Sequence, residues 1–262
     1  MEYEINPLRR DRYVYESILD FEQANRSPIY GYENEQILPL EEAVRPILFL
    51  LNNNLNYINT AKEKCNRQST DLTWDQSAAI YLYTMSTPLF THLNRFLRDE
   101  NRHALKPWFP FLKLLISGLQ KLSSSEVRVW RGVSSHLGSF STNEVKTWWS
   151  VNSTSKDINV VEHYVIDGGT LFLIEAIDGK IISEYSSFPE ENEVILLPGT
   201  RLRISAEPVH FLDRLLIVHL IEEQPLENTT RYVHIKNLIP SFSFDNHLKF
   251  LEMILTSMMR LI

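Results

Sequence analysis

The chain has 262 residues, a formal net charge of −7 and a single cysteine, and 44% of its residues are hydrophobic. This length fits one domain of moderate size with terminal extensions, and the hydrophobic content is sufficient for a substantial core. The acidic balance opposes a general nucleic-acid-binding surface, which needs clustered lysine and arginine. No apolar run approaches 18 residues, so we expect no membrane-spanning helix.

The cysteine content and the N-terminal sequence bear on location. Cys65 is the single cysteine and cannot form an internal disulfide. The first residues lack the basic and apolar blocks of a signal peptide. Both features favour a cytoplasmic protein, and a secreted form whose signal has been removed stays open.

The N-terminal third has partly helical apolar spacing. Residues 1–36 mix charged and aromatic residues without clean periodicity. Apolar residues recur at helical spacing over residues 38–58, where Pro46 should begin or kink a turn.

The next region predicts three further helices. Thr73 followed by Gln76 is a capping-box pattern for a helix over residues 74–85. Apolar spacing indicates two more helices, over residues 88–98 and 108–122. The first half of the chain is therefore expected to be mostly helical.

After Ser125 the sequence changes to short β-branched or aromatic runs that Gly, Asn, Asp and Pro separate. One helix interrupts these runs near residues 157–165, with Asp157 as its candidate cap. Helices followed by strands indicate an α+β fold. The predicted strands cover residues 127–130, 147–151, 170–176, 180–182, 194–197, 201–206 and 215–221.

The last segment reads as a linker followed by an amphipathic helix. Pro225 and Asn228 lie in the linker, and Asp245 precedes an apolar stripe from Leu248 to Met259. We expect this helix to dock on its own domain, with a partner or a membrane surface as the alternative.

Two carboxylates spaced one residue apart, Glu191 and Glu193, lead directly into a strand-forming run. In an extended backbone the side chains at i and i+2 point to the same side, so these carboxylates should project together. Like charges held so close favour a cationic partner or a chemical role. The alternatives are a solvated loop acid for Glu191 and an exposed strand-edge acid for Glu193.

Two upstream segments strengthen the chemical interpretation. Arg131 and Gly132 end an apolar strand, and the hydroxyl cluster Ser153-Thr154-Ser155 follows two tryptophans. An unpaired guanidinium would be costly to bury there, whereas its planar fork suits a pyrophosphate or a ribose. A structural ion pair with an acid of a neighbouring strand is the alternative for Arg131.

In that order and at those separations, Arg131, Ser153-Thr154-Ser155 and Glu191-Asn192-Glu193 resemble the Arg, Ser-Thr-Ser and Glu-x-Glu signature of the arginine-type mono-ADP-ribosyltransferases. The resemblance extends over roughly residues 72–223. It implies an ADP-ribosyltransferase-like α+β fold in which N-terminal helices precede a strand-rich, two-sheet catalytic core. The implied organisation is a helical extension (1–70), a catalytic domain (71–223) and a C-terminal extension (224–262).

The resemblance implies an enzyme that transfers ADP-ribose from NAD, its co-substrate, to an arginine of a protein acceptor and releases nicotinamide. Glu193 would stabilise the oxocarbenium-like ribose, as glycosidase carboxylates do. Glu191 would orient the arginine and take its proton. Two alternatives stay open: an NAD glycohydrolase that uses the same site, and a catalytically weak protein-interaction module.

The remaining site residues are expected to bind NAD. Arg131 would contact the pyrophosphate or ribose, and by resemblance the Gly132 main chain would hold the nicotinamide amide and Ser153 would hold Glu193. Thr154 and Ser155 would stabilise the loop and cap the next helix.

The residue that stacks on nicotinamide is the least defined part of the predicted site. Tyr164, on the interrupting helix, is the candidate, with Phe172 or Trp149 as alternatives. The glycines form neither a Gly-x-Gly-x-x-Gly motif nor a phosphate loop, so the NAD site is not a doubly wound one. The histidines show no metal-ligand spacing, and no metal is expected.

Overall fold

The computed structural model of the chain describes residues 29–99, 101–133, 140–162, 169–211 and 215–224. The chain divides into two compact units, Met1–Glu223 and Gln224–Ile262, and apart from residue 224 the described residues belong to the first. The predicted C-terminal amphipathic helix lies outside the described residues.

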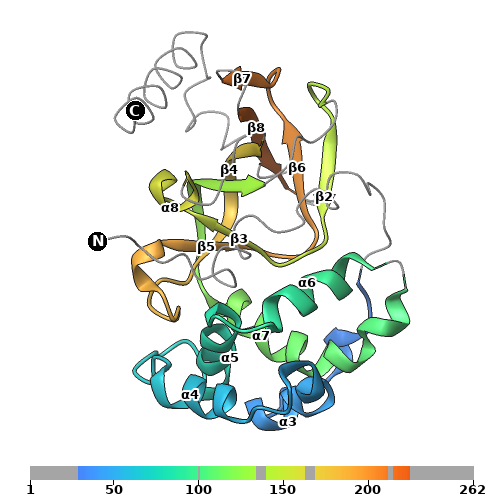
Figure 1. Cartoon of the computed structure of the whole chain (residues 1–262), viewed down its shortest axis with the longest axis vertical. Coiled ribbons are helices and arrows are strands. Elements are labelled where there is room, and N and C mark those ends of the chain that lie inside the picture. The colour runs from blue at the N-terminus through green and yellow to red at the C-terminus, as the bar shows by residue number, and fades with distance from the viewer. Residues whose placement is uncertain (1–28, 100, 134–139, 163–168, 212–214, 225–262) are drawn as a thin grey trace. The chain divides into compact units, whose positions relative to one another are not determined.

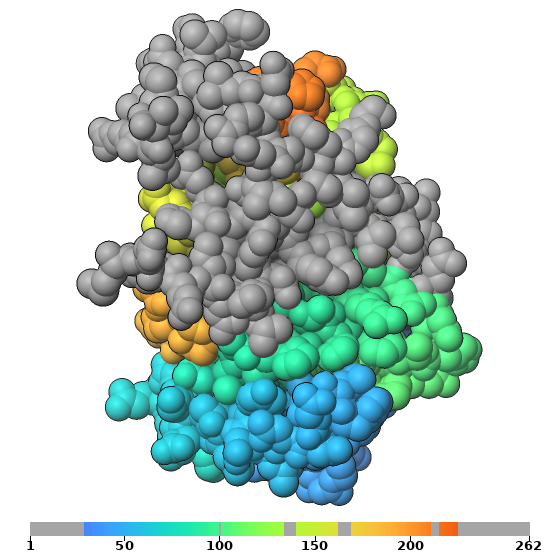
Figure 2. All heavy atoms as spheres, in the orientation of Figure 1, coloured from blue at the N-terminus to red at the C-terminus, as the bar shows by residue number. Residues whose placement is uncertain are grey.

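The described residues up to Lys121 are mostly helical, as predicted (Figure 1). The space-filling view shows the atoms of these helices, coloured blue to green, as one continuous region (Figure 2). With η marking 3-10 helices, the elements are η1 (Tyr32–Asn34), α3 (Leu40–Val44), η2 (Arg45–Leu51), α4 (Asn56–Lys64), α5 (Trp74–Thr84), α6 (Leu89–Arg98), η3 (Arg102–Trp108) and α7 (Phe109–Lys121).

The apolar stripe over residues 38–58 does not form one helix, because two local features interrupt it. Pro46 lies in the first turn of η2, where a missing backbone N–H is tolerated. Asn52 has a φ of 55° and ends η2 in the left-handed region that asparagine tolerates. The expectation that Pro46 begins a turn is confirmed, whereas α4 extends to Lys64, beyond the predicted stripe.

The capping box that opens α5 is confirmed. Thr73 Oγ1 accepts a hydrogen bond from the Gln76 backbone N–H at 3.2 Å, and Gln76 Oε1 accepts one from the Thr73 backbone N–H at 3.1 Å. Two backbone donors that a helix would otherwise leave without partners are thus satisfied.

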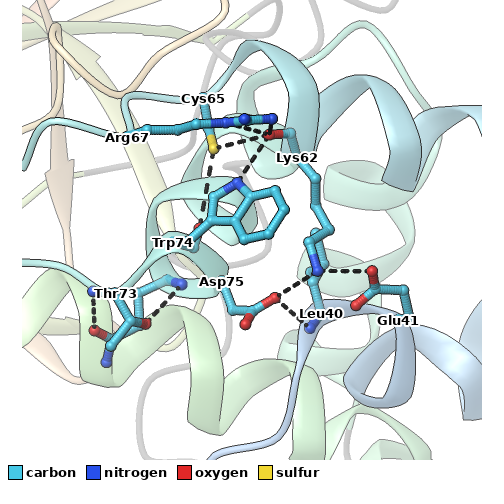
Figure 3. A network of polar contacts seen from close by, with 9 residues as sticks. Leu40, Glu41, Lys62, Cys65, Arg67, Thr73, Trp74 and Asp75 are labelled. Carbon is cyan, nitrogen blue, oxygen red and sulfur yellow. Dashed lines mark hydrogen bonds and ion pairs between the residues drawn. The ribbon is translucent and has the colours of Figure 1, made fainter.

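A polar network joins α3, α4 and α5 at the surface of the helical part (Figure 3). Lys62 Nζ lies 2.6 Å from Glu41 Oε1 and 3.2 Å from Asp75 Oδ1. Asp75 Oδ1 also accepts a hydrogen bond from the Leu40 N–H at 3.0 Å, and the Trp74 indole donates to the Lys62 carbonyl at 2.9 Å. Beneath this network the helices share one apolar core, which includes Ile47, Ile58, Leu82, Leu93 and Leu115.

The C-terminal part of the unit is rich in strands, and its described residues also include one short α-helix and one 3-10 turn. The elements are β1 (Ser124–Val133), β2 (Val145–Trp148), β3 (Asn152–Ser155), α8 (Ile158–Glu162), β4 (Gly169–Ile181), η4 (Pro189–Glu191), β5 (Glu193–Leu196), β6 (Thr200–Ile204), β7 (Val209–Phe211) and β8 (Leu215–Glu223).

Strand β4 is continuous where the sequence predicts two strands separated by a turn. Gly179 allows this, because a Cβ there would lie 2.9 Å from Val194 Cγ1 and 3.0 Å from Val127 Cγ1. The Glu222 carboxylate also accepts hydrogen bonds from the Ile177 and Asp178 N–H groups, at 2.7 Å and 3.1 Å. Tertiary contacts therefore hold extended a segment whose local sequence favours a turn.

Strand β4 is the centre of the sheet topology. It pairs with β8 in parallel and with β1 and β5 antiparallel, and β8 continues through β6 to β2. Strand β3 joins β1 to β5, so β1, β3, β5 and β4 close a hydrogen-bonded circuit. Helices followed by this strand-rich region confirm the predicted α+β fold. The predicted two-sheet core is instead one hydrogen-bonded sheet in the described residues, because the β4–β8 pairing joins its two halves. The predicted site residues that the structure describes lie on this circuit or directly beside it.

Candidate functional site

Arg131 lies near the end of β1 with its side chain buried. Its Nη1 donates a hydrogen bond to the Ser153 carbonyl at 2.5 Å. Its guanidinium carbon lies 5.9 Å from the centroid of the Trp148 ring, within cation–π range. The arginine and the hydroxyl cluster of the predicted signature are therefore in direct contact, and Gly132 follows, buried in β1 opposite Leu171.

The hydroxyl cluster forms β3, and each of its three hydroxyls has a defined contact. Ser153 Oγ lies 3.4 Å from the Tyr83 hydroxyl, and Thr154 Oγ1 donates to the Val194 carbonyl at 2.7 Å. Ser155 Oγ donates to the Glu191 carbonyl at 2.6 Å and accepts from the Asp157 N–H at 2.9 Å. The hydroxyl cluster thus contacts the segment that carries Glu191 and Glu193.

The helix that follows β3 is capped as predicted. Asp157 Oδ1 accepts a hydrogen bond from the Asn159 N–H at 2.9 Å, just before α8 begins at Ile158. The contact of Ser155 with the Asp157 N–H adds to this cap.

Glu191 and Glu193 do not lie together on one extended strand, and this part of the sequence interpretation is wrong. Glu191 ends the 3-10 turn η4, and Glu193 is the first residue of β5. Asn192 between them has a φ of 49°, so the backbone turns there and the i, i+2 rule for strands does not apply.

Strand β3 instead brings the two carboxylate residues together. Ser155 lies directly opposite Glu193 in the β3–β5 ladder, while its hydroxyl binds the Glu191 carbonyl. The Lys156 N–H donates to the Asn192 carbonyl at 3.3 Å, which supports the turn. The two glutamates are therefore positioned by their neighbour strand.

Burial excludes the two structural alternatives for these glutamates. Glu191 is 1% exposed and Glu193 is 0% exposed, whereas the adjacent Glu190 is exposed. Glu191 is thus not a solvated loop acid, and Glu193 lies in a strand flanked on both sides by β3 and β4. Buried carboxylates are costly, so two of them next to a strand of buried hydroxyl residues favour a functional role.

Ser153 differs from its expected role in one respect. Its Oγ contacts Tyr83, and the position opposite Glu193 belongs to Ser155. Because Ser153 and Ser155 are two residues apart on β3, they share a strand face with Glu193. That Ser153 orients the Glu193 carboxylate stays a prediction.

The aromatic candidates have different outcomes. Tyr164 lies outside the described residues. Phe172 is fully buried in the sheet core, where its ring meets Trp148 edge-on at 5.8 Å between centroids, so it is a packing residue. Trp149 is half-buried.

Sequence interpretation missed the residues by which the helices reach the site. Tyr83, Thr84 and Asn94 were assigned to helices without a role, yet each is buried and binds a strand or loop of the site. The available signal was the occurrence of polar side chains on otherwise apolar helix faces, which is also common in helices without function.

Within the described residues, no three His, Cys, Asp or Glu side chains form a group that could hold a metal ion. None of the helices in the described ranges has the length and apolar character needed to cross a bilayer.

Comparison with known proteins agrees with this geometry. A sequence model described as NAD:arginine ADP-ribosyltransferase matches residues 44–206. The match begins within the predicted extension of residues 1–70, and the boundary at residue 70 stays a prediction. The erythroblast NAD(P)(+)--arginine ADP-ribosyltransferase of Gallus gallus is 29% identical over 140 residues, which are 50% of this chain and 46% of the chicken protein. The chain thus matches about half the length of that relative.

Solved structures share the fold. The eucaryotic mono-ADP-ribosyltransferase ART2.2 superposes with a TM-score of 0.56 at 21% identity, covering 72% of this chain and 86% of that one. The ADP-ribosyltransferase Vis from Vibrio splendidus, in complex with agmatine, gives 0.52 at 18% identity, covering 80% and 93%. Since the family match extends over more than half of the sequence, this chain belongs to the NAD:arginine ADP-ribosyltransferase family.

Proposed function

We propose that this protein transfers ADP-ribose from NAD to an arginine side chain of a protein and releases nicotinamide. The observation that carries the proposal is the meeting of β1, β3 and the η4–β5 segment, the adjoining elements to which the buried residues Arg131, Ser153, Glu191 and Glu193 belong. Family membership and the arginine-directed activity named for the chicken relative support it.

The residues fit NAD as a substrate. Arg131 offers a charged, planar donor group that suits a pyrophosphate, and its contact with the Ser153 carbonyl holds it in place. Gly132, next in the strand, has no side chain to keep a ligand from its backbone. These two residues would bind NAD and orient its ribose toward the carboxylates.

In the reaction, the bond between ribose C1′ and the nicotinamide nitrogen breaks, and nicotinamide leaves with the bonding electrons. Positive charge develops on the ribose, and the Glu193 carboxylate stabilises it more in the transition state than in the ground state. An arginine nitrogen of the acceptor then donates its electron pair to C1′. Its proton passes to Glu191, which acts as a general base.

The test is incubation of the full-length protein with adenine-labelled NAD, with and without agmatine as an arginine mimic. We expect labelled ADP-ribosyl-agmatine and an equal amount of nicotinamide. Nicotinamide with only free ADP-ribose would assign the site to NAD hydrolysis. Absence of both NAD cleavage and NAD binding would overturn the enzymatic assignment in favour of an interaction module.

A further inference from the structure

The C-terminal end of α5 places two polar residues in succession inside the helical core. Tyr83 is 1% exposed and Thr84 is 0% exposed. Buried polar side chains are costly unless they form hydrogen bonds, so their partners indicate what they are for. These partners lie in two different segments of the proposed active site.

Tyr83 reaches strand β3. Its hydroxyl donates to the Val151 carbonyl at 3.1 Å and lies 3.4 Å from Ser153 Oγ. A phenol hydroxyl can donate only one hydrogen bond. Because Tyr83 donates it to the Val151 carbonyl, the Ser153 hydroxyl is the donor in the second contact. Tyr83 therefore contacts this segment at two points: Val151, just before β3, and Ser153, the first serine of the hydroxyl cluster.

Asn94 of α6 holds the same point of the chain from a second helix. Its Nδ2 donates to the Val151 carbonyl at 3.0 Å, and its Oδ1 accepts from the Val151 N–H at 3.0 Å. This two-point contact fixes both the position and the orientation of that peptide. Two residues later, the Ser153 carbonyl accepts the Arg131 guanidinium.

Thr84 reaches the other segment. Its Oγ1 accepts a hydrogen bond from the Ser187 N–H at 2.8 Å and donates to the Tyr81 carbonyl of its own helix at 2.9 Å. Ser187 lies four residues before Glu191, in the connection from β4 to β5. The hydroxyl of Thr84 thus ties this connection to the helix end.

We propose that Tyr83, with Asn94, and Thr84 are positioning residues that act on different steps of the proposed reaction. Tyr83 and Asn94 set β3, and through it Arg131 and Ser153, which belong to NAD cleavage. Thr84 sets the segment that leads to Glu191, which belongs to the arginine acceptor. The inference rests on the proposed function, because the two steps are those of arginine ADP-ribosylation.

A purely structural role would predict a different pattern. Loss of one buried hydrogen bond in a purely structural role lowers the melting temperature and has no selective effect on one step of the reaction. Loss of positioning changes the rate of the step that depends on the misplaced group, and a displacement of about 1 Å can cost up to about a hundredfold. For Thr84 the ratio of arginine transfer to NAD hydrolysis separates these possibilities, since global stability does not alter it. For Tyr83 and Asn94, which are proposed to serve the step common to both reactions, the two rates measured below the melting transition of the variant separate them.

The experiment compares Tyr83→Phe and Thr84→Val with Ser77→Ala as the matched control. Ser77 is also buried in α5, and its hydroxyl donates to the Asn66 carbonyl at 2.7 Å, away from the strands. Transfer to agmatine, nicotinamide release without acceptor, and the melting temperature are measured for each variant. Thr84→Ser, which retains the hydroxyl, serves as the rescue variant.

We expect Tyr83→Phe to lower both rates about tenfold, and Thr84→Val to lower transfer about tenfold while changing hydrolysis less than about threefold. Ser77→Ala should change neither rate more than about twofold, and Thr84→Ser should restore transfer. Asn94→Leu should reproduce the Tyr83→Phe pattern, since both act on Val151.

Two failures are distinguishable. In the first, the wild type is active and the Tyr83 and Thr84 variants have the same two rates, and so the same ratio of transfer to hydrolysis, as Ser77→Ala. This result would overturn the positioning roles and leave the proposed function in place. A wild type that neither cleaves NAD nor binds a carbocyclic NAD analogue in calorimetry would overturn the proposed function, and the positioning roles with it.

Discussion

Two polar clusters in this molecule differ in where they hold their charges. The network around Lys62 lies at the surface of the helical part, where the Lys62 side chain is 16% exposed and the Glu41 side chain 48% exposed (Figure 3). The cluster around Arg131 and Glu193 lies inside the strand-rich part, with almost no exposure. The Lys62 network pairs its base with two acids close to water, whereas the charged groups of the second cluster are almost fully buried, at a much higher cost.

The difference separates stability from function. Surface ion pairs contribute about 0–1 kcal/mol, and water screens them, so the Lys62 network joins helices at little cost. Buried ionisable groups lose hydration, and apolar residues of similar volume would often be at least as stable in their place. A buried cluster such as that of Arg131 therefore indicates chemistry, and variants in the two clusters should have opposite effects.

The largest effect is expected at Glu193. Glu193→Gln removes the carboxylate charge with almost no change in volume, so we expect kcat for nicotinamide release and for arginine transfer to fall at least about a hundredfold. The melting temperature should stay close to that of the wild type. A loss of less than about tenfold in kcat would remove Glu193 from the catalytic step.

Glu191→Gln should separate the two steps of the reaction. We expect transfer to agmatine to fall about tenfold or more, because a general base contributes about a hundredfold or more to proton transfer. Nicotinamide release into water should change less than about threefold on the same preparation. Equal loss of both rates would instead place Glu191 in NAD cleavage.

Arg131→Lys keeps the positive charge and removes the planar fork. We expect the dissociation constant for NAD to rise about tenfold, since an ammonium cannot reproduce two-point contact with a pyrophosphate. Calorimetric titration with NAD, or with its carbocyclic analogue, measures this directly. An unchanged titration would return Arg131 to a structural role.

The helical part should show the reverse pattern. Thr73→Ala removes the N-cap of α5, and we expect a loss of about 1 kcal/mol in the free energy of unfolding. For a protein of this size that corresponds to a fall of about 2–4 °C in melting temperature. Both enzymatic rates should remain within about twofold of the wild type below the melting transition. A selective loss of activity would show that the start of α5 also contributes to the site.

The smallest effect concerns Glu222, a half-buried carboxylate of β8 outside the signature. Burial raises its pKa, against the opposing effect of the hydrogen bonds from the Asp178 and Ile177 N–H groups. A raised folded-state pKa means that the stabilising contribution of the protonated form is complete below the unfolded pKa of about 4.3 and is lost as the pH rises through the folded pKa. Glu222→Gln keeps an acceptor oxygen and cannot ionise.

We therefore expect Glu222→Gln to gain stability relative to the wild type as the pH rises from 4 to 8, with activity unchanged. Urea unfolding at several pH values measures the difference in midpoint. A difference that stays constant with pH would show that ionisation of Glu222 is not linked to folding.

The local sequence is sufficient for several elements of this protein. The capping box at Thr73, the turn at Pro46 and the cap at Asp157 are recognisable because their partners lie within a few residues. The order of helices before strands, and the ordered Arg, Ser-Thr-Ser and Glu-x-Glu signature, likewise indicate the α+β fold and the family without coordinates.

Long-range contacts decide the remainder. Residues 177–179 continue β4 because Gly179 fits between Val127 and Val194, contacts that local turn propensity does not include. Glu191 and Glu193 are neighbours in the site because Ser155 lies opposite one and binds the carbonyl of the other, across 36 residues of chain. Tyr83 and Asn94 act on Val151 from helices 57 residues or more away in sequence. Such contacts depend on the packing of helices against strands, and neither periodicity nor motif spacing specifies that packing.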